Sequence, residues 1–200
     1  MNFKIVLPLN TDAEQTACLE RLQVAFAEAC NVLGPIVKDT RCWNRVALHH
    51  LTYHRLREQF PALGSQMVCN AIYSVSRSAR LIYQNPTSPW NIDARPGLAL
   101  PLMRFAPSAP VFFDRHTLSL KNGRLSMYTL DGRLRFDVSL NAEDEQRFRE
   151  EKLKEILLTR DQSGFCLLFT FGEVDDKTAP QADMPQYVLL VEAEETAEAA

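Results

Sequence analysis

The chain has 200 residues, 46% of them hydrophobic, and a formal net charge of −3. This length and composition are sufficient for a buried core in one domain or two small ones. No long apolar run occurs, and the N-terminal MNFKIVLPLN lacks the basic-then-apolar pattern of a signal peptide, so we expect a cytoplasmic protein without a membrane segment. Five cysteines form no Cys-x-x-Cys pair, which indicates buried thiols and argues against disulfides or a zinc site.

Charge is distributed unevenly along the chain. Residues 1–40 hold three basic and five acidic side chains, residues 41–135 hold thirteen and four, and residues 136–200 hold six and sixteen. The three segments therefore carry −2, +9 and −10. A middle segment at +9, rich in arginine, is typical of a surface that binds a polyanion.

The first part of the chain predicts one strand followed by three helices. MNFKIVLPL alternates apolar and polar residues, as a strand with one buried face does. The first helix begins with a capping box of Thr11 and Glu14 and is predicted to end at Gly34-Pro35. Apolar spacing predicts the second helix at about residues 40–60 and the third at about residues 65–84.

The third predicted helix has two different faces. At 100° per residue its apolar residues fall on one side, and its polar residues fall within an arc of about 80° on the other. No acidic residue occurs between residues 59 and 92. Arginine binds phosphate bidentately and tyrosine stacks on bases. The polar face is therefore either an ordinary solvated surface or a nucleic-acid contact made by Asn70, Tyr73, Arg77, Arg80 and Gln84.

Beyond residue 85 the sequence predicts strands. Six prolines between residues 86 and 110 exclude a long helix there. Asn122-Gly123 and Asp131-Gly132 then separate alternating segments, which predicts an antiparallel meander of at least three strands. A short helix capped at Asn141 precedes further strands in EILLTR, FCLLFTF and QYVLLVE.

The order of elements predicts an α+β fold. Because a lone N-terminal strand is unstable, we expect it to pair with the later strands in an antiparallel, OB-like β-barrel made of residues 1–10 and 86–192. The three helices of residues 11–85 form an inserted lobe in this interpretation. Residues 193–200 form an acidic tail.

Three other groups of residues have the composition of possible sites. His50 and His54 have metal-ligand spacing, but the glutamate of a His-Glu-x-x-His motif and a third ligand are missing. Ser119 and Ser126 near His116 lack a paired acid, so no hydrolase triad is expected. Basic residues in the second helix and the hairpins are either solubilising charges or contacts to an RNA backbone, and they are Arg55, Arg57, Arg115, Lys121, Arg124, Arg133 and Arg135.

Three segments resemble one protein family in unbroken order over residues 1–192. They are YHRLREQFPALGSQMVCNAIYSVSRSAR, FDRHTLSLKNGRLSMYTLDGRLRFDVSL and KLKEILLTRDQSGFCLLFTFGEV. This pattern resembles the N-terminal half of TnpB, the RNA-guided endonucleases of insertion sequences, to which type V CRISPR effectors are similar. The resemblance implies a wedge barrel and a recognition lobe that hold a guide-type RNA and its duplex with target DNA.

The chain departs from the TnpB pattern where the nuclease would begin. The RuvC aspartates and glutamate and the zinc-ribbon cysteines of that family have no counterpart here, so the resemblance implies binding without cleavage and without a cofactor. A separately encoded RuvC-type or effector protein would then attach near Tyr187 to Glu192. The acidic residues 173–183 are either a solvated loop, a surface that repels nucleic acid, or a dock for a basic partner.

Two alternatives to RNA binding stay open at this point. The chain is either a protein-interaction subunit of a CRISPR- or transposon-related complex that has lost RNA binding, or the truncated remnant of a transposon protein. A salt titration separates RNA binding from the first alternative, because several phosphate contacts make affinity fall steeply with salt.

Overall fold

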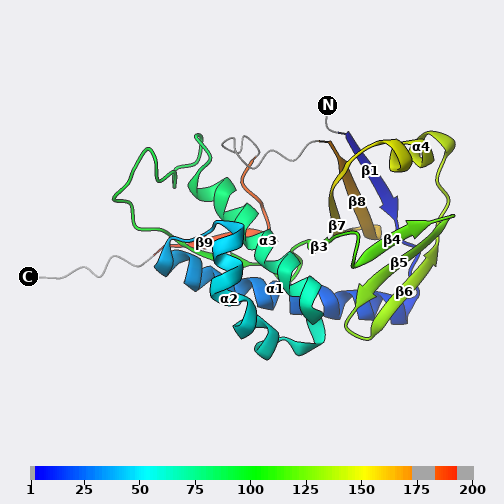
Figure 1. The fold of residues 1–200 in the computed structure, drawn as a ribbon, viewed down its shortest axis with the longest axis horizontal. Coiled ribbons are helices and arrows are strands. Elements are labelled where there is room, and N and C mark those ends of the chain that lie inside the picture. Colours follow the sequence, from blue (N-terminus) through cyan, green and yellow to red (C-terminus); the bar gives the residue numbers. More distant parts are fainter. Residues whose placement is uncertain (1–2, 173–182, 193–200) are drawn as a thin grey trace, which may run out of the picture.

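The computed structural model describes residues 3–172 and 183–192 (Figure 1). Its fold is α+β with antiparallel sheets, as predicted. The acidic segment up to residue 182 and the tail at residues 193–200 lie outside the described residues. None of the helices described is long and apolar enough to cross a membrane.

The described strands form three separate antiparallel sheets. The largest has the order β1-β8-β7-β3 and contains β1 (Phe3–Pro8), β8 (Gly164–Phe171), β7 (Leu153–Asp161) and β3 (Val111–Phe113). The second pairs β2 (Leu102–Phe105) with β9 (Val188–Val191). The third is the predicted meander of β4 (Leu118–Lys121), β5 (Arg124–Thr129) and β6 (Gly132–Asp137).

The pairing of the first strand is confirmed, whereas a closed barrel is not. β1 runs antiparallel to β8, with Ile5 opposite Phe169, so the N-terminus joins strands from the far end of the chain. The hydrogen-bonded ladders among the described strands do not close into one cylinder, because each sheet ends in edge strands. The hairpin signals are also confirmed, since Asn122 and Gly123 both have positive φ in the β4–β5 turn.

The helices occupy the predicted order between β1 and β2 and after β6. They are α1 (Ala13–Thr40), α2 (Arg45–Gln59), the 3-10 turn η1 (Pro61–Leu63), α3 (Gly64–Tyr83) and α4 (Ala142–Glu150). α2 begins later than predicted because Asn44 caps it, accepting the N–H groups of Val46 and Ala47. Asn141 caps α4 as predicted.

The start of α1 corrects the predicted capping box. The side chain of Asp12, not that of Thr11, accepts a hydrogen bond from the backbone N–H of Gln15 at 2.8 Å. In return, the Gln15 side chain accepts a hydrogen bond from the backbone N–H of Asp12 at 3.0 Å. Thr11 instead shares a hydrogen bond with the hydroxyl of Thr16. The motif is therefore one residue later than the sequence pattern suggested.

The end of α1 is also corrected, because the helix continues through Pro35 to residue 40. At Gly34 it crosses β2 so closely that an added Cβ would lie 2.4 Å from the carbonyl oxygen of Met103. One turn earlier, the Asn31 amide accepts the N–H of Phe105 and donates to its carbonyl, at 2.7 and 3.0 Å. These contacts with β2 hold the helix together beyond its Gly-Pro pair.

One hydrophobic core joins the helices to the sheets. α1, α2 and α3 pack against one another, α1 also packs on β2, and α3 packs on β3. In Figure 1, α1 extends from the β2–β9 pair towards the β4–β6 meander. Arg21 of α1 and Asp131 at the β5–β6 turn form an ion pair at that end.

Candidate nucleic-acid interface

The pairing register of the β4–β6 meander collects the predicted hairpin cations on one face. Lys121 lies opposite Arg124, and Ser126 lies opposite both Ser119 and Arg135. Directly paired residues, and residues two apart on one strand, point to the same side of a sheet. We call this side the sheet face, and it is formed by Ser119, Lys121, Arg124, Ser126, Tyr128, Arg133, Arg135 and one acid, Asp137.

The other side of the meander is buried. Leu125, Met127 and Phe136 alternate with the residues of the sheet face and enter the core. The four cations of the sheet face are exposed, whereas the apolar side keeps the meander attached to the rest of the fold. The alternation therefore fixes which way the cations point.

Two of these arginines are held in place by their neighbours. Arg133 donates from Nε to the Ser126 hydroxyl at 2.9 Å and from Nη2 to the Ser126 carbonyl at 3.2 Å. Arg124 pairs with Asp137 at 3.5 Å, and both side chains are exposed. Lys121 and Arg124 are like charges on directly opposed residues, which disfavours the hairpin unless an anion lies between them.

Tyr128 connects the sheet face to the helices. Its hydroxyl donates to the carbonyl of Ala62 in η1, at 2.6 Å. Burial raises the pKa of this phenol, and the nearby positive charge of Arg57 opposes the shift. Arg57 of α2 therefore lies beside the sheet, and a basic surface runs from the meander to the second helix.

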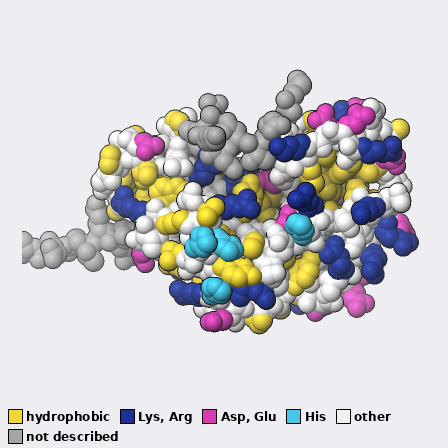
Figure 2. All heavy atoms as spheres, in the orientation of Figure 1, with side chains coloured by type: hydrophobic (Ala, Val, Ile, Leu, Met, Phe, Trp, Pro, Cys, Tyr) yellow, Lys and Arg dark blue, Asp and Glu magenta, His cyan; other side chains and the backbone are white. Residues whose placement is uncertain are grey.

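Figure 2 shows this surface from one side. Lys and Arg side chains gather over the β4–β6 meander and recur towards α2 and α3, where histidines also lie. Of the predicted residues outside the meander, Arg115 in the β3–β4 loop and Arg55 on α2 are exposed, and Arg57 is partly buried.

The polar face predicted for α3 is largely covered, which corrects the expectation that it is displayed to solvent. Asn70 is only 7% exposed, and its amide donates to the Thr117 hydroxyl at 3.5 Å. Tyr73 is partly buried, with its ring edge-on to Phe112. Arg80 is partly buried as well. The covering elements come from β3 and the loop after it, far along the chain from α3.

Arg77 is part of an internal ion pair. Its Nη1 atom lies 3.2 Å from Oε1 of Glu155 on β7, and the two side chains are 35% and 7% exposed. Burial raises the pKa of Glu155, and the positive charge of Arg77 opposes that shift. The guanidinium also lies over the ring of Phe112. Arg77 therefore ties the helices to the large sheet, a role that its helical spacing did not indicate.

Sequence reasoning missed a row of residues on α2. Arg45, His49, Tyr53 and Arg57 recur at every fourth position and lie along one side of the helix, and we call them the α2 stripe. The His49 and Tyr53 rings are stacked with centroids 4.7 Å apart. The Arg45 guanidinium lies 5.2 Å from the ring centroid of Tyr73 on α3. The four-residue spacing was visible in the sequence and is the signal that would have found the row.

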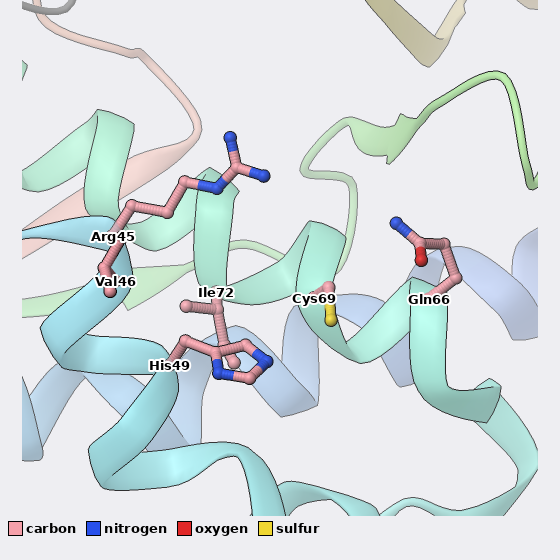
Figure 3. A pocket seen from close by; sticks show the side chains of 6 residues that line it. All are labelled: Arg45, Val46, His49, Gln66, Cys69 and Ile72. Atoms are coloured by element: carbon pink, nitrogen blue, oxygen red, sulfur yellow. The ribbon is translucent and has the colours of Figure 1, made fainter.

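A pocket of about 290 Å³ lies between the α2 stripe and α3 (Figure 3). α2 contributes Arg45, Val46 and His49, and α3 contributes Gln66, Cys69 and Ile72. The His49 ring extends from α2 into the space between the two helices (Figure 3).

The five cysteines are free thiols, but the prediction that they are buried is confirmed for only two of them, because Cys42, Cys69 and Cys166 are partly exposed. Cys18 and Cys30 are buried, and burial raises the pKa of Cys30 to about 12. In the part of the chain that the structure describes, no three His, Cys, Asp or Glu side chains come together as metal ligands. His50 and His54 thus lie on α2 without a third ligand nearby in that part of the chain.

Comparison of the sequence with models of known protein families and with curated proteins gave no match.

Proposed function

We propose that this protein binds nucleic acid without cutting it, in the manner of the wedge and recognition parts that it resembles in TnpB. It holds a guide-type RNA and that RNA's duplex with target DNA, and it acts in the cytoplasm. Base pairing reads the sequence, and the protein grips backbone and shape. In this proposal the sheets correspond to the wedge barrel, and α1–α3 correspond to the recognition lobe.

The sheet face is the observation that carries the proposal. Four exposed cations share one side of a sheet with a tyrosine and two serines, which are side chains that contact phosphate, sugar and base. Exposed cations contact RNA only if they can leave their protein partners, and the acid that pairs with Arg124 on this face, Asp137, is itself exposed. The surface is therefore open to an anionic backbone.

A salt titration of RNA affinity tests this proposal. The variant Arg124→Ala/Arg135→Ala should weaken binding of a structured RNA and lower the slope of log affinity against log salt by roughly 0.7–0.9 for each phosphate that the protein no longer contacts. Arg149→Ala is the matched control, since this arginine is exposed on α4 and pairs only with Glu145 one turn away among the described residues. A salt slope near zero for the unmodified protein would refute the proposal.

A second candidate function is a protein-interaction subunit, and β9 favours it. Leu189 and Val191 are 61% and 45% exposed on this strand, which pairs with β2. Exposed apolar residues on a short edge strand suit the addition of a partner's strand. A RuvC-type or effector protein attached at residues 187–192 would contact them. Loss of co-purification of such a partner in Leu189→Lys, together with no salt-dependent RNA binding by the unmodified protein, would support this second function.

A further inference from the structure

The α2 stripe combines the residue types that contact single-stranded nucleic acid. Cations stand at both ends, Arg45 and Arg57, and two stacked aromatic rings stand between them. Twelve residues of α-helix span about 18 Å. Arginine binds phosphate oxygens, and aromatic rings stack on bases of any sequence.

The pocket beside the stripe is lined in part by the His49 ring. Tyr53 covers one face of the His49 ring and does not line the pocket, so the pocket meets His49 at its other face or its edge. Ile72 and Cys69 provide an apolar floor on α3. A volume of about 290 Å³ lies at the lower end of pockets that hold small ligands, and it suits one base with its sugar.

The charges around the pocket favour an anion. The charged side chains that act on the Cys69 thiol are Arg45, Arg57 and Asp114. Burial raises the pKa of this thiol, and the two arginines oppose the shift. Two cations therefore stand against one carboxylate, which accepts a hydrogen bond from Gln66 at 2.6 Å.

Arg57 also has unused hydrogen-bonding capacity. Its Nη1 atom is buried and has no hydrogen-bond partner among the described residues. A buried guanidinium nitrogen without an acceptor is costly, so Arg57 would gain a hydrogen bond by turning outward to a phosphate oxygen of a bound strand. The Tyr128 hydroxyl donates to Ala62 and keeps lone pairs that could accept, but it forms no hydrogen bond with this Arg57 nitrogen.

We propose that the pocket between α2 and α3 binds one nucleotide of a single-stranded segment, with its base against the His49 ring and its phosphate at Arg45, and that a phosphate further along the same nucleic-acid strand lies at Arg57. This inference rests on the proposed function and adds a second, different contact to it. The sheet face grips the backbone of structured RNA, and the pocket takes a base that is not paired. The bound RNA therefore leaves the sheet face near Tyr128 and continues to α2.

The test compares oligonucleotide affinity in three variants. A fluorescein-labelled single-stranded RNA of about 12 nucleotides is the probe. His49→Ala should weaken binding about fivefold or more, whereas His54→Ala, which removes the same ring from an exposed position outside the pocket, should change affinity by less than about twofold. Arg124→Ala/Arg135→Ala reports on the sheet face in the same assay. Urea unfolding checks that each variant is folded.

A second measurement uses the unmodified protein. Bound oligonucleotide should protect the Cys69 thiol from N-ethylmaleimide, as followed by mass spectrometry, while Cys166 on β8 serves as the internal control. Adenosine monophosphate is tested in parallel. If it protects Cys69 as well as the oligonucleotide does, the pocket is still a nucleotide site, and its ligand is a free nucleotide.

The outcomes separate this inference from the proposed function. If the sheet-face variant loses affinity but His49→Ala does not, and Cys69 stays unprotected, the pocket assignment is wrong and RNA binding stands. If the unmodified protein binds no RNA, the proposed function fails, and the pocket stays a nucleotide site only if adenosine monophosphate protects Cys69. Protection of Cys69 by a partner protein, with no effect of RNA, would assign the pocket to protein contact and overturn the inference.

Discussion

Replacing Arg77 by alanine should destabilise the protein more than it weakens RNA binding. The substitution removes the guanidinium that lies 3.2 Å from Glu155 and leaves a carboxylate that is only 7% exposed. Breaking a buried ion pair costs about 3–5 kcal/mol, and breaking an exposed one costs about 0–1 kcal/mol. Arg77 is itself 35% exposed, and Lys4 and Lys154 also act on Glu155, so the expected loss is intermediate.

We expect a loss of about 2–3 kcal/mol in the free energy of unfolding. For a chain of 200 residues, each kcal/mol lost from the free energy of unfolding lowers the melting temperature by about 2–4 °C, so Tm should fall by roughly 5–10 °C. Arg77→Ala/Glu155→Gln should recover part of the loss, because it removes the unpaired charge along with its partner. Urea unfolding followed by circular dichroism measures all three proteins.

RNA affinity of the folded Arg77→Ala variant provides the contrast. With Arg77 in an internal ion pair, affinity measured well below the melting temperature should stay within about twofold of the unmodified protein. If stability is unchanged within about 0.5 kcal/mol and affinity falls instead, the ion pair is not a structural link. Arg77 would then be the phosphate contact that its position on the helix suggested.

Three further predictions test other parts of the structure. Burial raises the pKa of Glu155 in the folded state, so the folded protein holds the Glu155 proton up to a higher pH than the unfolded chain does. Glu155 should therefore lower the free energy of unfolding as pH rises from the pKa of the unfolded state through the pKa of the folded state. In Glu155→Gln this decrease should be absent from urea midpoints measured across that pH range. Gly34→Ala should cost about 1–3 kcal/mol by forcing α1 away from β2, while Gly97→Ala, in open space, should be neutral in the same assay. Lys121→Glu should raise hairpin stability by about 0.2–1 kcal/mol, because it faces Arg124, yet weaken RNA binding; a gain in both would contradict the role of the sheet face.

Local patterns in the sequence predicted the elements whose geometry is set locally. Asn122-Gly123 adopts positive φ at both residues, which few other pairs do without strain, so the hairpin and its register follow from two residues. The register then decides that Lys121, Arg124, Arg133 and Arg135 share a face. This part of the candidate interface was therefore predictable.

Long-range contacts decided what the sequence patterns missed. α1 continues past Gly34 because β2 lies against it, and β2 is formed by residues about seventy positions further along the chain. The polar side of α3 is covered by β3 and the residues after it, which helical periodicity cannot detect. Likewise Glu155, the partner of Arg77, belongs to a strand beyond the meander.

Cross-linking of the protein to RNA in its native cells tests the central claim most directly. After ultraviolet irradiation and purification, the bound RNA is sequenced and the cross-linked peptides are identified by mass spectrometry. We predict a discrete small RNA, joined to peptides of the sheet face around Tyr128 and of the α2 stripe around Tyr53. Recovery of the protein without RNA, with the sheet face covered by a partner chain, would contradict the account.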